Sequence, residues 1–119
     1  ALPIYKVAAV VAYYPPVDLR PMADKNSKRF PALNFPAEQA ASVSPILHVD
    51  AADPPTLLIH GTKDTLVPIS NSEKLIEALS KHEVVSDFIS LPGAGHGFRD
   101  EQRTQASKAR LDWFRKHLL

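Results

Sequence analysis

Two short glycine-containing stretches each carry one residue able to take part in acid–base chemistry. Three of the four glycines lie around His96 in LPGAGHGF, residues 91–98, and the fourth lies in LLIHGTKD, just before Asp64. Glycine permits tight turns and close backbone approaches. An aspartate that accepts a hydrogen bond from one imidazole nitrogen leaves the other nitrogen free to act as a base near neutral pH. Asp64 and His96 are therefore the candidate catalytic residues.

Both residues are expected at one edge of a parallel sheet. Three short apolar runs predict buried strands at residues 6–14, 56–61 and 84–93, because continuous apolar runs are typical of strands covered on both faces. Asp64 follows the second run and His96 follows the third. Chemistry in such sheets gathers at the carboxyl ends of the strands, so the two side chains are expected to meet if these strands are neighbours.

Helical patterns between and after the strands indicate an α/β fold. They cover residues 70–82 and 100–119. The alternation predicts a three-stranded parallel sheet with flanking helices, in a single domain of residues 1–119. Six of the eleven prolines lie between residues 15 and 45, so this segment is expected to be irregular and cap-like.

The start of one helix and the buried face of the other can also be predicted. Ser70 and Glu73 have the spacing of a capping box at the start of the first helix. In the second helix, Leu111, Phe114 and Leu118 recur at helical spacing. These three residues are expected to form its apolar face.

The two loop sequences together resemble those of a known superfamily. PPTLLIHGTKDTLVP followed by LPGAGHGF is similar to the closing segment of α/β-hydrolases, in the branch of carboxylesterases, dienelactone hydrolases and prolyl-oligopeptidase-type enzymes. VAAVVAYYPPVDLR and SPILHVD resemble that fold's sixth strand and the approach to its seventh. The order of Asp before His fits the superfamily's chain order of Ser, Asp, His. The resemblance implies that the chain corresponds to the C-terminal half of the fold, with Asp64 as triad acid and His96 as triad base.

The sequence departs from the superfamily in its nucleophile. None of the four glycines flanks a serine in the pattern G-x-S-x-G. Ser42 and Ser44 in SVSP are not expected to replace it, because nothing in the sequence brings them to His96. The resemblance therefore implies part of a serine carboxylesterase or lipase that hydrolyses small esters without a cofactor. The nucleophile and the oxyanion hole are expected upstream, so the isolated chain should be weakly active or inactive.

Two other functions stay open at the level of sequence. The first predicted strand is as hydrophobic as a central strand, yet no neighbour precedes it, and such edges associate with other chains. One alternative is thus a non-catalytic, self-associating domain, with a homo-oligomer that joins two first strands. The other is a minimal esterase with an unorthodox serine nucleophile. The partner in the leading hypothesis is instead an N-terminal hydrolase half.

Other residues near the two loops are assigned simpler roles. Tyr13 and Tyr14 end the first strand and are expected to pack in the core, with an acyl pocket at the rim as the alternative. His60 precedes a turn glycine and is expected to pack or bond locally. The other three histidines lack the spacing of metal ligands, so no metal site is expected; they are His48, His82 and His117.

Composition excludes several broad classes. The net charge is +1, with positive and negative residues interspersed, which argues against a nucleic acid partner. No apolar run approaches 18 residues, so no membrane span is expected, and a cytoplasmic location is the default expectation. The absence of cysteine excludes disulfides and thiol nucleophiles.

Overall fold

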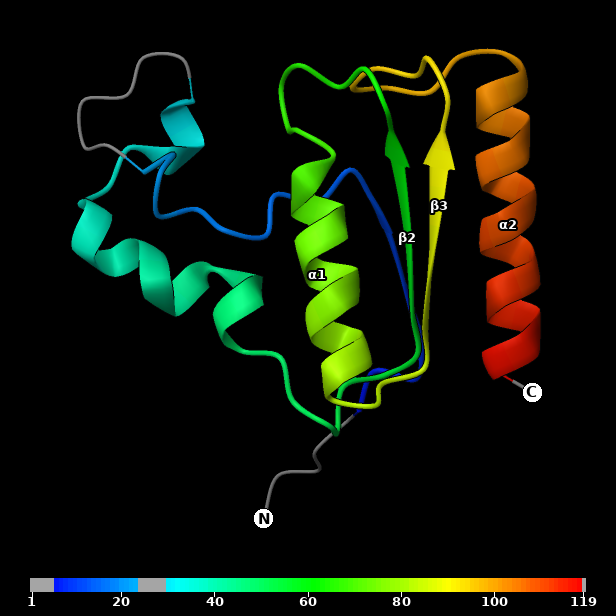
Figure 1. Ribbon diagram of the computed structural model, residues 1–119, viewed down its shortest axis with the longest axis horizontal. Helices are drawn as coiled ribbons and strands as arrows, with labels where there is room; N and C mark the ends of the chain where they lie inside the picture. Colours follow the sequence, from blue (N-terminus) through cyan, green and yellow to red (C-terminus); the bar gives the residue numbers. More distant parts are fainter. Residues whose placement is uncertain (1–5, 24–29, 119) are drawn as a thin grey trace.

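A computed structural model describes residues 6–23 and 30–118 and places three strands in one parallel sheet (Figure 1). The strands are β1 (Val10–Tyr13), β2 (Thr56–Gly61) and β3 (Ser86–Leu91), in that order across the sheet. Two longer helices, α1 (Ser70–Lys81) and α2 (Glu101–His117), follow β2 and β3 respectively. The predicted fold class, a parallel three-stranded sheet with flanking helices, is confirmed.

The lengths of the outer strands follow from the central one. Pairing begins where Thr56 lies opposite Val10 and Ser86, because the two prolines before Thr56 have no N–H to donate. The pairing of β2 with β3 ends where Gly61 lies opposite Leu91. The outer strands are therefore shorter than predicted, and the prediction of a first strand from residue 6 was wrong.

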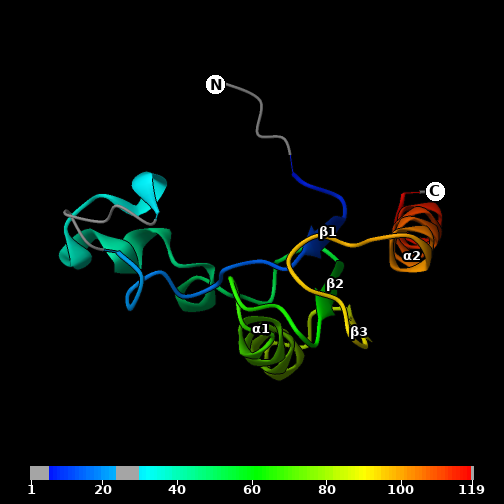
Figure 2. The same ribbon diagram turned by 90° about the horizontal axis from the view of Figure 1, so that it is seen from above.

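The two helices cover opposite faces of the sheet (Figure 2). All six residues of β2 are buried, and they alternate between the faces as strand geometry requires. Leu57 and Ile59 pack in the cluster that includes Trp113 of α2. His60 instead hydrogen-bonds to Ser72 of α1. The central strand thus has the two-sided burial that its continuous apolar run predicts.

The start of α1 differs from the sequence-based prediction. Ser70 is already helical, the residue at the helix boundary is Ile69, and no side chain caps this end. Ile69 has right-handed helical backbone angles, and its carbonyl accepts a hydrogen bond from the Glu73 N–H. The capping box of Ser70 and Glu73 was therefore a wrong prediction, because a preceding helical turn supplies the backbone acceptor.

The buried face of α2 is also different from the predicted one. Leu111 is 49% exposed and Leu118 is 54% exposed. The buried residues of this helix are Ala106 and Trp113, which lie two turns apart on one face. The indole N–H of Trp113 donates to the Pro55 carbonyl (3.3 Å). The rotation of α2 is thus determined by the fit of one small and one large residue against the sheet.

The proline-rich segment lies beyond α1, away from the sheet (Figure 1). Its described part holds three 3-10 helices, η1 (Pro31–Leu33), η2 (Ala37–Val43) and η3 (Pro45–Leu47); residues 24–29 lie outside the described part of the chain. The buried Ser44 hydroxyl donates to the Ala40 carbonyl and accepts from the Leu19 N–H. Ser44 thus joins two parts of the segment and is inaccessible to a substrate.

None of the helices in the described ranges is long and apolar enough to cross a membrane.

Candidate active site

The loops after β2 and β3 are joined to one another by backbone hydrogen bonds. The Thr62 N–H donates to the Leu91 carbonyl (3.1 Å) and the Lys63 N–H donates to the Ala94 carbonyl (2.9 Å). In the opposite direction, the Gly93 N–H donates to the Thr62 hydroxyl (2.8 Å). These bonds hold the two loops side by side at the carboxyl edge of the sheet.

Three of the four glycines are required by this junction. Gly93 and Gly97 have φ values of +78° and +117°, which side-chain-bearing residues rarely adopt. At Gly61, an added Cβ would lie 2.1 Å from the Ala94 carbonyl oxygen. Gly95 has neither property, because the nearest atom to its added Cβ is 3.8 Å away. Of the three glycines around His96, Gly93 and Gly97 therefore have backbone angles that call for glycine, and Gly95 does not.

Asp64 is a buried carboxylate with a full set of donors. One oxygen, Oδ1, accepts hydrogen bonds from the N–H groups of Leu66 (2.9 Å) and Val67 (2.8 Å). The other, Oδ2, accepts from Nδ1 of His96 (2.9 Å). Burial alone would raise the pKa of Asp64, but these hydrogen bonds outweigh burial and hold that pKa below its usual value. Asp64 is therefore ionised at neutral pH.

His96 lies at the surface with one nitrogen engaged. Its side chain is 33% exposed, whereas that of Asp64 is fully buried. Because an ionised carboxylate only accepts hydrogen bonds, Nδ1 of His96 carries the proton. Among the described residues, no hydrogen bond reaches Nε2 of His96. Nε2 is consequently a free acceptor at the edge of the site, as the sequence-based prediction of a base requires.

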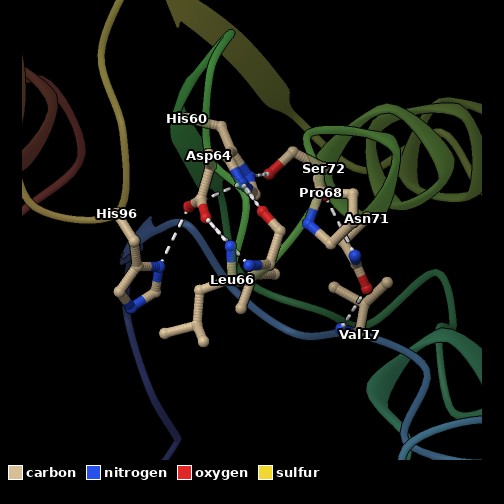
Figure 3. A network of polar contacts seen from close by, with 9 residues as sticks. Val17, His60, Asp64, Leu66, Pro68, Asn71, Ser72 and His96 are labelled. Atoms are coloured by element: carbon tan, nitrogen blue, oxygen red, sulfur yellow. Dashed lines mark hydrogen bonds and ion pairs between the residues drawn. The ribbon is translucent and has the colours of Figure 1, made fainter.

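His60 belongs to the same network from the buried side (Figure 3). Its Nε2 lies 2.7 Å from the Val67 carbonyl and 3.4 Å from Oδ2 of Asp64, and its Nδ1 lies 2.7 Å from the Ser72 hydroxyl. Since a carbonyl only accepts, Nε2 carries the proton and the Ser72 hydroxyl donates to Nδ1. The sequence predicted local bonding for His60 and missed its approach to Asp64. The spacing of four residues across the Gly61 turn was the available signal.

Two tyrosines and Phe98 form an aromatic cluster beside His96. The ring of Tyr14 lies 4.2 Å from that of His96 and 5.0 Å from that of Phe98, measured between centroids. Tyr13 contacts Phe98 at 5.2 Å, and its buried hydroxyl has no hydrogen-bond partner among the residues that the structure describes. Tyr13 therefore packs in the core, as expected, whereas Tyr14 also reaches the site.

An open cavity adjoins the histidine loop. Its volume is about 830 Å³, and it lies between residues 92–97 and the start of α2, with His96, Arg99 and Gln105 among its lining residues. In the part of the chain that the structure describes, no three His, Cys, Asp or Glu side chains are grouped to hold a metal ion. Independently of that, a carboxylate bonded to Nδ1 of an imidazole with a free Nε2 is an arrangement that can support proton transfer.

Three serines of the described residues have hydrogen-bond partners other than His96. Ser72 is fully buried and bonded to His60, and Ser44 is fully buried in the proline-rich segment. Ser42 is exposed, and its hydroxyl donates to the Gln39 carbonyl (2.8 Å). The sequence-based expectation that Ser42 and Ser44 do not serve as nucleophiles agrees with these contacts.

Comparison with known proteins gives consistent similarities. Residues 5–119 match the model of the prolyl oligopeptidase family. The chain is 41% identical over 58 residues to an esterase, LipC, of Mycobacterium tuberculosis, a stretch covering 46% of this chain and 14% of that protein. It is 34% identical over 76 residues to the acylamino-acid-releasing enzyme of Arabidopsis thaliana, covering 63% of this chain and 10% of that one.

The fold comparison leads to the same group of proteins. The structure of a truncated carbohydrate esterase from gut microbiota superposes with a TM-score of 0.72 at 30% identity, covering 90% of this chain and 42% of that chain. The present chain thus spans less than half the length of each of these proteins. With 115 of its 119 residues inside the matching family model, the chain belongs to the prolyl oligopeptidase family, within the esterase- and peptidase-like α/β-hydrolases.

Proposed function

We propose that this chain supplies the acid and the base of a Ser–His–Asp triad that hydrolyses small carboxylic esters, with Asp64 as acid and His96 as base. The observation that carries the proposal is the hydrogen bond of 2.9 Å between Nδ1 of His96 and Oδ2 of Asp64. It joins a buried carboxylate to a partly exposed imidazole at the carboxyl ends of neighbouring strands. This arrangement leaves Nε2 facing outward as the proton acceptor.

The proposed chemistry follows from that geometry. Nε2 of His96 takes the proton of a serine hydroxyl as the serine oxygen attacks the ester carbonyl carbon. The same proton then passes to the leaving alcohol as the carbon–oxygen bond breaks, which leaves an acyl-serine. Nε2 next takes a proton from a water whose oxygen attacks the acyl carbon. The bond between the acyl carbon and the serine oxygen then breaks, the carboxylic acid leaves, and Nε2 returns the proton to the serine oxygen. Throughout, ionised Asp64 holds the imidazole orientation and stabilises its charged form.

The serine in this proposal comes from outside the chain, on an N-terminal hydrolase half. Within residues 6–23 and 30–118, β1 has a hydrogen-bonded neighbour on one side only, and a free strand edge accepts another strand. An apolar groove of about 320 Å³ lies beside β1, with Val10, Ala12 and Leu58 in its lining. A strand paired to β1, with its connecting helix over this groove, would bring a nucleophile to the edge where His96 lies.

The first test compares esterase activity with and without His96. We expect the isolated chain and its His96→Ala variant to hydrolyse p-nitrophenyl butyrate at the same background rate. In the complete gene product, His96→Ala should lower turnover by a factor on the order of 10⁵ to 10⁶, while Asp64→Asn should lower it by about 10⁴. An unchanged turnover in the complete product with His96→Ala would refute the proposed base.

A serine-reactive fluorophosphonate separates the proposal from a minimal esterase. If the nucleophile lies elsewhere, the isolated chain stays unlabelled. Labelling of the isolated chain that disappears with His96→Ala would show that a serine of this chain is the nucleophile, and the proposed division of the triad would be wrong.

Self-association is a second candidate, favoured by the exposed apolar surface. Among the described residues no strand pairs with the outer edge of β1, and Leu111 of α2 and Leu118 just after it are exposed. A homodimer that joins two β1 strands would cover the first of these surfaces. Light scattering tests this candidate: a mass twice that of the 13.1 kDa chain supports it, and a monomer mass at micromolar concentration contradicts it.

A further inference from the structure

Tyr14 has a backbone conformation that its sequence position disfavours twice. Its φ is +41°, a region that bulky residues rarely occupy. The residue that follows is Pro15, and a proline restricts the preceding residue to extended angles with negative φ. Such a conformation persists only where surrounding contacts hold it, and residues of this kind concentrate at functional sites.

The unusual φ changes the side of the sheet on which Tyr14 packs. Consecutive residues of a strand point to opposite faces, so a continued β1 would direct Tyr13 and Tyr14 apart. Instead, both tyrosines pack against the same core cluster, which contains Phe98 and Trp113. The Tyr14 N–H still donates to the Ile59 carbonyl (2.8 Å). The backbone therefore turns at Tyr14 itself, immediately after the last residue of β1.

The turn brings the Tyr14 ring against the imidazole of His96. Their centroids lie 4.2 Å apart with an angle of 45° between the ring planes. Phe98 holds the Tyr14 ring in place, because the two rings pack edge-on with their centroids 5.0 Å apart. The covalent bond to Cβ and the hydrogen bond from Nδ1 to Asp64 hold two points of the imidazole ring, so the ring can still tilt about the line that joins them. A second contact on the ring is needed to fix the direction of Nε2.

We propose that Tyr14 is a positioning residue for His96: its left-handed backbone places an aromatic ring against the imidazole and holds Nε2 in one direction. The inference rests on the proposed function for its kinetic consequence, whereas the ordering of the His96 ring is a property of the chain alone.

The structural consequence can be measured by NMR on the chain as it is. Tyr14→Gly and Tyr14→Asn both remove the aromatic ring and keep residue types that accept positive φ. We expect each to broaden or abolish the hydrogen-bonded Nδ1–H resonance of His96, and Tyr14→Phe to retain it. Tyr13→Phe is the matched control, since that neighbouring tyrosine packs on Phe98. Circular dichroism tests whether each variant folds. If one of the two variants without the ring does not fold, the other still tests the inference.

The kinetic consequence is measured in the complete gene product. Loss of the Tyr14 ring should lower kcat by a factor of about 10 to 100 and leave KM unchanged, because Tyr14 contacts the base and misplacement of a catalytic group costs about this much. Tyr14→Phe should restore most of the rate. An unaltered His96 resonance in a folded Tyr14→Gly or Tyr14→Asn variant would overturn the inference.

The two proposals fail in different ways. If His96→Ala leaves the turnover of the complete product unchanged, the proposed function is wrong, and the NMR result still decides whether Tyr14 orders His96. If His96→Ala abolishes turnover and the ringless variants keep the wild-type kcat, the proposed function stands and the role of Tyr14 is refuted.

Discussion

Replacing Gly61 by alanine would add one methyl group between the two loops of the site and should push them apart. An added Cβ would lie 2.1 Å from the Ala94 carbonyl oxygen, 2.5 Å from its carbonyl carbon and 2.8 Å from its Cβ. All three atoms belong to the loop that carries His96, and two of them are backbone atoms that no side-chain rotation can move. Gly61→Ala must therefore shift one loop against the other.

The size of the shift follows from these distances. Side-chain Cβ contacts below 3.0 Å are essentially never observed, so the methyl group and the oxygen must separate by at least about 0.9 Å, the difference between 3.0 and 2.1 Å. The same oxygen accepts the Lys63 N–H at 2.9 Å. A shift of this size along that bond would lengthen it beyond hydrogen-bonding distance. The hydrogen bond from His96 to Asp64 joins the same two loops and should be disturbed as well.

The expected loss of stability is about 2 kcal/mol. Overpacking costs about 1–3 kcal/mol, and a lost hydrogen bond adds about 1 kcal/mol. Replacing glycine by alanine also lowers the conformational entropy of the unfolded chain, which stabilises the folded state by about 0.4–1 kcal/mol. Urea unfolding followed by circular dichroism measures the sum, and the Nδ1–H resonance of His96 reports the loop geometry.

Gly95→Ala is the matched control in the facing loop. Its added Cβ would meet only the Lys63 carbonyl oxygen at 3.8 Å, which is ordinary contact. We expect this variant to stay within about 0.5 kcal/mol of the wild type and to keep the His96 resonance. Equal urea midpoints and equal His96 resonances in the two variants would refute the close approach of the loops as the reason for glycine at position 61.

Three further predictions concern single groups. Asp64→Asn should lower stability at pH 7 by about 1–3 kcal/mol. Because the folded-state pKa of Asp64 is lowered, its ionised form stabilises the fold above the unfolded pKa of about 3.9, and this stabilisation is lost as pH falls through the folded-state pKa. The urea midpoints of the wild type and of Asp64→Asn should therefore converge between pH 7 and pH 2.5. A constant difference between the two midpoints would contradict this. Ser72→Ala removes the donor to the buried Nδ1 of His60 and should cost about 1–3 kcal/mol in urea unfolding, whereas the exposed Ser80→Ala on the same helix should have little effect; similar losses would exclude a specific role for the hydroxyl. Tyr14→Gly should be more stable than Tyr14→Ala by about 1 kcal/mol, since both lack the ring and only alanine is strained at φ +41°; the usual order, with alanine more stable, would show that the left-handed backbone is absent in solution.

The sequence determined those features that depend on local pattern and on general rules of sheet geometry. The apolar runs and their spacing predicted a parallel α/β sheet, because such runs suit strands buried on both faces. The juxtaposition of Asp64 and His96 also followed from sequence, since neighbouring parallel strands carry their loops to the same edge. The observed distance of 2.9 Å between them agrees with that prediction.

Only the tertiary structure decided which side chains meet around this pair. The approach of His60 to Asp64 and to Ser72 depends on the packing of α1 against β2, and the rotation of α2 depends on the fit of Trp113 to the sheet. The positive φ of Tyr14 is opposed by every local preference, including that of the following proline. Contacts between residues distant in sequence outweigh local preference at these places, and the geometry around His96 is determined there.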